Sequence, residues 1–247
     1  MRLFSDLAAH YFQLENRRAT LERDTRGLLE FFAPGSRVLD LGCGTGEHVA
    51  VLRKAGLDCE GLDIAPDMIA LARERFGDHF RVADFRDMPA KGLQGRYAGC
   101  FSLFGSFGYL PDDAALVRAL RVVAALLASG GLFVVEVWHR PPYESLKQPV
   151  VSPSIRLRVN HRVLVRERRA GVERRENRLY AAIHHRYFAE EAAGETFEET
   201  HLMRVFTVDE FRALAETAGL ELIQVLGDVG GGVWRESGNG LVLVLRK

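Results

Sequence analysis

The stretch VLDLGCGTGEH (residues 38–48) sets a short apolar run directly against Gly42, Gly44 and Gly46. Glycine weakens regular structure because its backbone has the most freedom to lose, so such a cluster indicates that something must approach the main chain closely. A helical pattern follows in EHVAVLRKAG (47–56). The spacing of the glycines differs from G-x-G-x-x-G, and three ligands suit the turn: a dinucleotide, a phosphate or another adenosine-bearing cofactor. The order strand, glycine-rich turn, helix indicates a ligand site at the edge of a parallel sheet.

Strand and helix patterns alternate on both sides of this turn. We expect further strands at 57–63, 80–85, 97–104, 132–138, 220–226 and 240–247, and helices at 14–32, 65–77, 111–131 and 207–219. The alternation predicts an α/β domain whose parallel sheet is covered on both faces. The segment between the last two strands is too short for a helical crossover, which predicts that the final strand is antiparallel.

Residues 150–206 follow a period of two instead. In IRLRVNHRV (155–163) apolar and polar residues alternate, RAG (169–171) has the composition of a tight turn, and 195–206 has the character of another strand. This pattern predicts an antiparallel β-meander inserted into the α/β domain. The α/β pattern resumes at Thr207, which forms a capping box with Glu210.

These patterns divide the chain into three parts. We expect an N-terminal helical cap (1–36), a ligand-binding core (37–138 and 207–247), and an antiparallel insert (139–206) that covers the active site.

The composition excludes several classes of partner. Lysine plus arginine and aspartate plus glutamate each number 33, so no net field favours a nucleic acid or a membrane. The three cysteines form no C-x-x-C pair, which fits a reduced protein without a metal site. The chain has neither an apolar signal core nor an 18-residue apolar run. We therefore expect a cytoplasmic protein. We further expect a monomer or a homodimer.

Three acids stand where the first three core strands end or approach their ends. Asp40 precedes the glycine turn, Asp63 ends the second strand, and Asp84 ends the third. All three should lie at the carboxyl edge of the sheet, where open α/β folds bind ligands. An acid at Asp63 suits two ribose hydroxyls and one at Asp84 suits an adenine amino group. A dinucleotide site explains Asp63 but requires neither of the others.

Several motifs resemble, in order and spacing, those of class I S-adenosylmethionine-dependent methyltransferases: VLDLGCGTGEH, GLDIAPDMIALARERF, FRVADFRDMP and GGLFVVEVW. The resemblance implies a Rossmann-like seven-stranded sheet with an antiparallel last strand and an inserted meander lid. It implies S-adenosyl-L-methionine as cofactor, with S-adenosyl-L-homocysteine as product. The cofactor residues that it implies are Asp40, Gly42, Cys43, Gly44, Thr45, Gly46, Asp63, Ile64, Met68, Asp84, Phe85 and Leu103.

The segment after the fourth strand, FSLFGSFGYL (101–110), lacks the [DN]-P-P-[YF] sequence of enzymes that methylate base amines. Cys100 lies inside a strand and is interpreted as a core residue, not as a nucleophile. With HLMRVF (201–206) and the insert, the segment resembles small-molecule N-methyltransferases, above all N,N-dimethyltransferases of nucleotide-linked amino sugars. Glycine and sarcosine methyltransferases are more distant. The N-terminal sequence departs from the Tyr-Asp-rich openings of the sugar enzymes, so the resemblance leaves the acceptor open.

Methyl transfer to an amine requires alignment, exclusion of water and a neutral nitrogen. Candidate catalytic residues are Tyr109, His201, Tyr11 and Glu136, each of which also suits a purely structural role. Candidate substrate residues are Tyr109, Trp138, His139 and Arg140. His184 and His185 are adjacent and should point to opposite faces of a strand.

The stretch 156–178 carries nine arginines and three acids. Most of these arginines are expected to form surface ion pairs, which contribute little to stability. Arginine also binds phosphate in a bidentate way, so the hypothesis is that one or two arginines of the meander, or Arg140 at its entrance, hold an anionic part of the substrate. In a regular strand Arg156, Arg158 and Arg162 lie on one face, which must then look toward the cleft. A nucleotide diphosphate is the favoured anion and a carboxylate the alternative.

Three other functions remain open from the sequence. The protein could bind S-adenosylmethionine as a sensor, or catalyse a cofactor-dependent reaction without methyl transfer. Methylation of a nucleic acid is less favoured, and steep salt dependence of RNA binding would indicate it.

Overall fold

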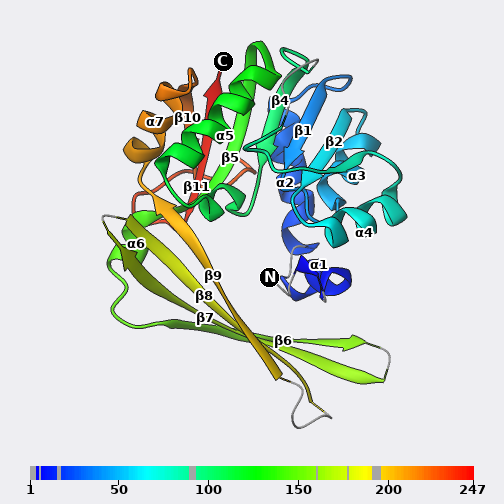
Figure 1. The fold of residues 1–247 in the computed structure, drawn as a ribbon, viewed down its shortest axis with the longest axis vertical. Helices are drawn as coiled ribbons and strands as arrows, with labels where there is room; N and C mark the ends of the chain where they lie inside the picture. Colours follow the sequence, from blue (N-terminus) through cyan, green and yellow to red (C-terminus); the bar gives the residue numbers. More distant parts are fainter. Residues whose placement is uncertain are drawn as a thin grey trace.

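The computed structural model describes residues 4–5, 7–15, 18–88, 93–159, 161–176, 178–190 and 196–247. Within this part of the chain, a Rossmann-like sheet forms the upper half of the molecule and an antiparallel sheet extends below it (Figure 1). The upper sheet has the strand order β3-β2-β1-β4-β5-β11-β10. Its strands are β1 (Arg37–Leu41), β2 (Asp58–Asp63), β3 (Phe80–Val82), β4 (Tyr97–Ser102), β5 (Leu127–His139), β10 (Glu221–Leu226) and β11 (Gly240–Arg246).

The last strand, β11, confirms the expectation drawn from the short connection before it. It runs antiparallel to β5 on one side, where Leu243 pairs with Val135, and antiparallel to β10 on the other, where Leu243 pairs with Val225. The other pairs of neighbouring core strands are parallel. The α/β fold class is therefore confirmed.

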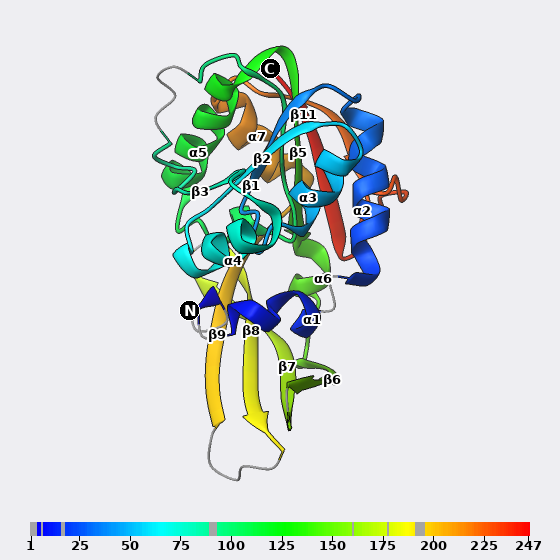
Figure 2. The ribbon, with the colours of Figure 1, turned by 90° about the vertical axis from the view of Figure 1, so that its right-hand side faces the viewer.

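Helices cover both faces of this sheet (Figure 2). On one face, α2 (Arg18–Phe31), α3 (Glu47–Lys54) and α4 (Pro66–Phe76) enclose a core that includes Leu28, Val49 and Ile69. On the other, α5 (Asp113–Leu126) and α7 (Val208–Thr217) pack over a second core. Because both faces are covered, β1 is buried along nearly its whole length.

The capping box at the start of α7 is also confirmed. The Thr207 hydroxyl accepts the backbone N–H of Glu210, and the Glu210 carboxylate accepts the N–H of Thr207. This reciprocal pair satisfies two donors that the first helical turn leaves open.

The N-terminal segment differs from the single helix expected at 14–32. A 3₁₀ turn, η2 (Ala8–His10), leads into the short helix α1 (Tyr11–Leu14), and a separate helix α2 begins at Arg18. Residues 16–17 of the expected helix lie outside the described residues. At the end of α1, the Glu15 side chain reaches Arg166 of the insert, an interaction that local helical periodicity does not encode.

The insert is a four-stranded antiparallel sheet in the order β9-β8-β7-β6. Its strands are β6 (Val150–Val159), β7 (Arg162–Arg175), β8 (Arg178–Ala189) and β9 (Thr196–Phe206). The short helix α6 (Arg140–Glu144) leads into it, and β9 joins the core through a two-residue parallel pairing with β5. The N-terminal segment lies between the insert and the core (Figure 1).

The turn expected at 169–171 was wrong. These residues lie inside β7, where Gly171 pairs with Ala182 of β8. Glycine tolerates extended backbone as well as turn geometry, so the sequence RAG does not distinguish a strand from a turn. The chain instead reverses at Glu176, whose φ is +51°.

Among the described residues, no helix is long and apolar enough to span a bilayer.

Candidate functional site

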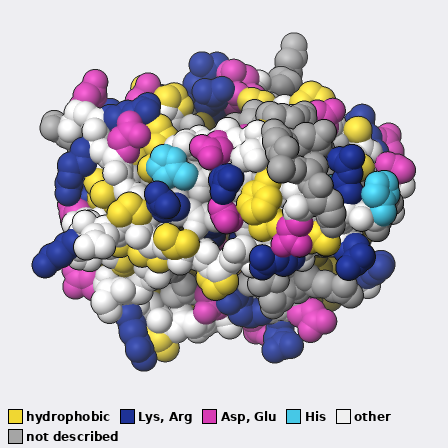
Figure 3. Space-filling view, turned by 90° about the horizontal axis from the view of Figure 1, so that it is seen from below, with side chains coloured by type: hydrophobic (Ala, Val, Ile, Leu, Met, Phe, Trp, Pro, Cys, Tyr) yellow, Lys and Arg dark blue, Asp and Glu magenta, His cyan; other side chains and the backbone are white. Residues whose placement is uncertain are grey.

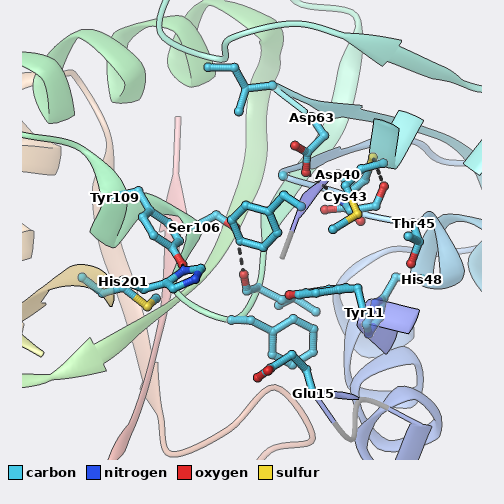
Figure 4. Close-up of a pocket in the computed structure, with 18 of the residues that line it drawn as sticks. Tyr11, Glu15, Asp40, Cys43, Thr45, His48, Asp63, Ser106, Tyr109 and His201 are labelled. Carbon is cyan, nitrogen blue, oxygen red and sulfur yellow. Dashed lines mark hydrogen bonds between the residues drawn. The ribbon is translucent and has the colours of Figure 1, made fainter. Parts of the chain in front are cut away.

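A pocket lies between the carboxyl edge of the parallel strands, the N-terminal segment and the insert (Figure 4). Its glycine-loop end contains Asp40, Asp63 and the turn after β1. Its other end, called here the His201 end, contains residues from three separate parts of the chain: Tyr11, Glu15, Tyr109, Arg168, His185 and His201. Phe4, Phe12, Phe104 and Trp138 contribute aromatic walls.

Most residues expected to hold the cofactor line this pocket. They are Asp40, Gly42, Cys43, Gly44, Thr45, Asp63, Ile64, Met68, Asp84, Phe85 and Leu103. Gly46 is the exception and does not line it. Gly46 caps the start of α3 with a φ of +86°, and a Cβ there would lie 2.6 Å from the Phe80 ring. The lack of a side chain at Gly46 leaves room for Phe80 and Ala72, which pack against this position.

The backbone holds the Asp63 carboxylate in place. One oxygen accepts the N–H of Gly44 and the other accepts the N–H of Ala65, each at 2.9 Å. A carboxylate oxygen has two acceptor sites, so each oxygen keeps capacity for a hydroxyl donor. The nearest group to a Cβ added at Gly44 is the Tyr11 ring, at 3.8 Å. The glycine turn therefore faces the N-terminal segment.

Burial makes the carboxyl group of Asp40 a weaker acid than usual. Its side chain is almost fully buried, and desolvation, with the Asp63 carboxylate nearby, raises its pKa well above the ordinary value. Desolvation likewise raises the pKa of Asp63, while its backbone hydrogen bonds oppose the shift. A cationic group brought between these two acids would relieve the unfavourable burial of charge.

Asp84 differs from the other two acids. It forms a hydrogen-bonded ion pair with Arg86, which lowers the pKa of Asp84 and keeps it ionised. The expected contact between Asp84 and an adenine amino group must therefore share this carboxylate with Arg86. Ile64 lines the pocket and is 64% exposed, which suits a position that a bound ring would cover.

At the His201 end, a hydrogen-bonded chain links two elements far apart in sequence. The hydroxyl of Tyr109, in the 3₁₀ helix η3 (Ser106–Tyr109), lies 2.7 Å from Nδ1 of His201 on β9. Nε2 of His201 lies 3.1 Å from Glu199 on the same strand. The Phe4 ring packs edge-on against both the Tyr109 and His201 rings. The sequence interpretation missed Glu199, although period-two alternation places Glu199 and His201 on one face of a strand.

Two other expected residues, Tyr11 and Trp138, line the pocket, whereas three do not. Glu136 accepts the backbone N–H of Phe104 at 2.8 Å, so it braces the loop behind the pocket. His139 is buried, with Nδ1 2.9 Å from the carbonyl oxygen of Gly238. Arg140 pairs with Glu144 and Glu210 at the start of the insert. Their geometry does not support direct contact with a substrate.

The basic face expected from Arg156, Arg158 and Arg162 was wrong. These residues are exposed and do not line the pocket. The strand ends at Val159, so Arg162 begins the next strand. Direct cross-strand partners share a face, and Arg156 pairs with Val165, which places it on the face opposite Arg166 and Arg168.

Arg168 is the arginine of this stretch that lines the pocket, and it lies over the Trp138 ring at 5.6 Å. Arg166 is buried and donates to Glu15 at 2.8 Å. His185 is buried and lines the pocket while His184 is exposed, which confirms that the adjacent histidines face opposite ways. Glu15 and His48 also line the pocket, and the sequence interpretation had not identified them.

Charges on the face that carries the insert are mixed. Seen from below, lysine and arginine side chains are interspersed with acidic ones and do not gather into one basic area (Figure 3). Ion pairs such as Arg156–Glu190 and Arg186–Glu167 account for several of them. The described residues on this face do not form the basic stripe typical of nucleic-acid binding.

Comparison with known proteins gives consistent matches. The family model described as "Methyltransferase domain" matches residues 13–225. The chain is 31% identical over 198 residues to dTDP-3-amino-3,4,6-trideoxy-alpha-D-glucopyranose N,N-dimethyltransferase from Streptomyces venezuelae, covering 79% of this chain and 80% of that protein. It is 28% identical to dTDP-3-amino-3,6-dideoxy-alpha-D-glucopyranose N,N-dimethyltransferase from Streptomyces fradiae, over 81% of this chain and 76% of that one.

A solved structure agrees with the sequence matches. CalS10, an amino pentose methyltransferase from Micromonospora echinaspora solved with SAM bound, superposes with a TM-score of 0.68 and 26% identity. The superposition covers 95% of this chain and 91% of that one.

Proposed function

Because this chain belongs to the methyltransferase-domain family and is an S-adenosylmethionine-dependent methyltransferase, we propose that it methylates the amino group of a nucleotide-linked sugar. The acceptor class is taken from the similar N,N-dimethyltransferases of dTDP-amino sugars. The Tyr109–His201 pair at the end of the pocket opposite the glycine loop is the observation that carries the proposal.

The residues at the glycine-loop end fit the cofactor. S-adenosylmethionine supplies an electrophilic methyl group on a sulfonium when it is bound. In our assignment Gly44 lets the methionine portion lie against the main chain, beside the Tyr11 ring that lies 3.8 Å from its Cβ position. Asp63 accepts the ribose hydroxyls and Ile64 covers the adenine. Buried Asp40 complements positive charge on the methionine portion.

The His201 end provides a route for the proton that an amine loses on methylation. With its proton on Nε2, His201 donates a hydrogen bond to Glu199, and in this tautomer Nδ1 accepts a hydrogen bond from the Tyr109 hydroxyl. The Tyr109 oxygen can then accept a proton from the acceptor nitrogen while its own proton moves to His201. The resulting imidazolium is stabilised by Glu199. Tyr11 and Phe4 close the pocket from the N-terminal side and exclude water.

An anionic part of the acceptor has a partner in Arg168. Its guanidinium lies over Trp138 at the insert side of the pocket, where it can contact a diphosphate in a bidentate way. This assignment replaces the exposed Arg156 and Arg158 with the one arginine of the stretch that lines the pocket. The substrate is then an anionic small molecule, consistent with the mixed charges of the outer surface (Figure 3).

The direct test incubates the protein with S-adenosylmethionine and dTDP-3-amino-3,4,6-trideoxyglucose, and follows S-adenosylhomocysteine and the product mass. We expect methylation, and a weaker reaction with the free amino sugar. Arg168→Gln should raise KM for the nucleotide sugar about 10-fold, the size of one charge-assisted contact. Arg169→Gln, the exposed neighbour on the same strand, is the matched control and should change KM little. Absence of any product, or preference for the free sugar, would contradict the proposal.

A further inference from the structure

A buried polar cluster lies beside the Tyr109–His201 pair and contains hydrogen-bonding atoms that the protein itself does not satisfy. His185 is 5% exposed, Tyr187 is fully buried and Arg166 is 4% exposed. Among the described residues, Nδ1 of His185, the hydroxyl of Tyr187 and Nε of Arg166 have no hydrogen-bond partner. Buried polar groups of this kind are costly unless they meet a partner, so the cluster is suited to a polar ligand group.

The pocket reaches this cluster through two residues. Glu15 and His185 both line the pocket, and Nδ1 of His185 lies 3.9 Å from Oε1 of Glu15. That separation is too long for a direct hydrogen bond. An oxygen placed about 2.8 Å from each atom would see them at an angle of about 90°, which suits a hydroxyl that donates to one and accepts from the other.

The protonation states favour this bridging role. The Glu15 carboxylate is held by Arg166, whose guanidinium donates to the same Oε1 at 2.8 Å, and the second lone pair of that oxygen stays available. Burial, and after it the charge of His201, lowers the pKa of His185 to about 3, so the ring is neutral near pH 7. Facing a carboxylate, the neutral ring is favoured with its proton on Nδ1, where it can donate to the bridging oxygen.

The cluster also lies at the right place relative to the reacting nitrogen. The rings of His185 and His201 meet edge to face with centroids 5.1 Å apart, and His185 stacks on Tyr187. Substituents on adjacent carbons of a sugar ring lie within a few ångströms of each other. An amine at the Tyr109–His201 pair therefore presents the substituent on a neighbouring carbon to His185.

We propose that Glu15 and His185 form a hydroxyl-binding subsite that selects acceptors carrying a hydroxyl on the carbon next to the methylated amine. The inference rests on the proposed function, and it adds a determinant of specificity to it. The hydroxyl accepts from Nδ1 of His185 and donates to Oε1 of Glu15, so an acceptor without this hydroxyl leaves both buried groups without a ligand partner.

The test compares three acceptors that differ by single hydroxyls. The parent is dTDP-3-amino-3,6-dideoxyglucose, whose amine is flanked by hydroxyls at C2 and C4, and the other two lack one or the other. With the wild-type protein, we expect kcat/KM to fall about 10-fold or more for one of the two deoxy analogues. In His185→Phe, which keeps a stacked ring but no ring nitrogen, the difference between parent and analogue should fall below about threefold.

Two further variants keep the test interpretable. His185→Asn retains a donor near the position of Nδ1 and should preserve part of the selectivity. His184→Phe changes the adjacent, exposed residue and should leave the selectivity unchanged. Binding of S-adenosylhomocysteine to each variant verifies an intact fold.

The outcomes separate the two claims. Equal kcat/KM for all three sugars, or an unchanged selectivity in His185→Phe, would overturn the subsite while the proposed function stands. Absence of methylation of all three would overturn the proposed function and the subsite with it.

Discussion

At the glycine-loop end of the pocket, Gly44 and Asp63 meet across 19 residues of chain, and Asp63 bonds Ala65 two residues away. At the His201 end, Tyr109 and His201 are 92 residues apart, and Glu15 and Arg166 are 151 apart. The first end is formed where neighbouring strands of one sheet finish side by side. The second is formed where the N-terminal segment, a loop and the insert meet.

The two ends also differ in what holds them. Backbone N–H groups hold Asp63, and backbone geometry follows from the sheet itself. The His201 end is held by side chains against side chains, including a nearly buried ion pair between Glu15 and Arg166. Substitutions at the first end should therefore cost ligand affinity in an intact fold, whereas those at the second should cost stability or turnover.

The largest effect is expected from Asp63→Ala. Loss of two charge-assisted hydrogen bonds to ribose, each worth about 1.5–3 kcal/mol, should weaken S-adenosylhomocysteine binding at least about 100-fold. Isothermal titration calorimetry measures the change. Asp58→Ala, an exposed acid at the other end of the same strand, serves as control. Unchanged affinity in Asp63→Ala would remove the ribose assignment.

Arg166→Met tests whether the stability of the His201 end depends on the ion pair between Arg166 and Glu15. The variant leaves the Glu15 carboxylate buried without its partner, and such losses cost about 3–5 kcal/mol of unfolding free energy. Urea denaturation should show this loss, and the double variant Glu15→Gln with Arg166→Met should recover most of it. If the double variant is no more stable than Arg166→Met, the buried charge is not the cause.

His201→Ala should act on turnover alone. A general base contributes about 100-fold or more, so kcat should fall by at least that factor. Affinity for S-adenosylhomocysteine should stay within about twofold, because the residue lies at the other end of the pocket from Asp63. Tyr109→Phe should reduce kcat in the same direction. A wild-type kcat in both variants would return the pair to a packing role.

Asp40→Asn should stabilise the ligand-free protein. The pKa of Asp40 in the folded state lies above its ordinary value of 3.8, because desolvation, and then Asp63, disfavour the charge. The folded state therefore binds the proton more tightly, and stability is lost as the pH rises above about 4 through the folded pKa. The variant should gain on the order of 1 kcal/mol at pH 7 and show a flatter pH profile by thermal denaturation. The variant should also bind the cofactor less well. Equal stability of the two proteins at pH 7 would mean that burial does not raise the pKa of Asp40.

The smallest effect is expected from Arg156→Gln. Arg156 is exposed and paired with Glu190, on the face of the insert opposite Arg168. Because surface pairs contribute about 0–1 kcal/mol, KM for the nucleotide sugar should change less than about twofold. A rise comparable to that of Arg168→Gln would place the anion on the outer face of the insert.

Much of the core was predictable because its signals are local. Alternating strand and helix patterns, the capping box at Thr207 and the short connection before β11 each depend on a few neighbouring residues, and all three were confirmed. The glycine-loop pattern also pointed to residues that line the pocket, except Gly46, whose role in packing depends on the Phe80 ring from another strand.

The insert was harder because alternation identifies strands but not where they turn. Treating 155–163 as one strand placed Arg156, Arg158 and Arg162 on one face, whereas the structure separates β6 from β7 and brings Arg168 to the pocket. Glu136, His139 and Arg140 do not line the pocket for a related reason. Their positions at the end of β5 were expected correctly, but their side chains are engaged by a loop backbone, Gly238 and Glu210.

The amino-acid sequence alone determined the α/β class, the antiparallel last strand and the methyltransferase family, because backbone periodicity and contiguous motifs carry that information. Only the tertiary structure decided that Glu15, Glu199, Arg168 and His185 share one pocket with Tyr109 and His201. Their proximity depends on how a four-stranded insert and an N-terminal segment pack against the core. Side-chain contacts over such separations in sequence leave no local pattern, so folding alone brings them together.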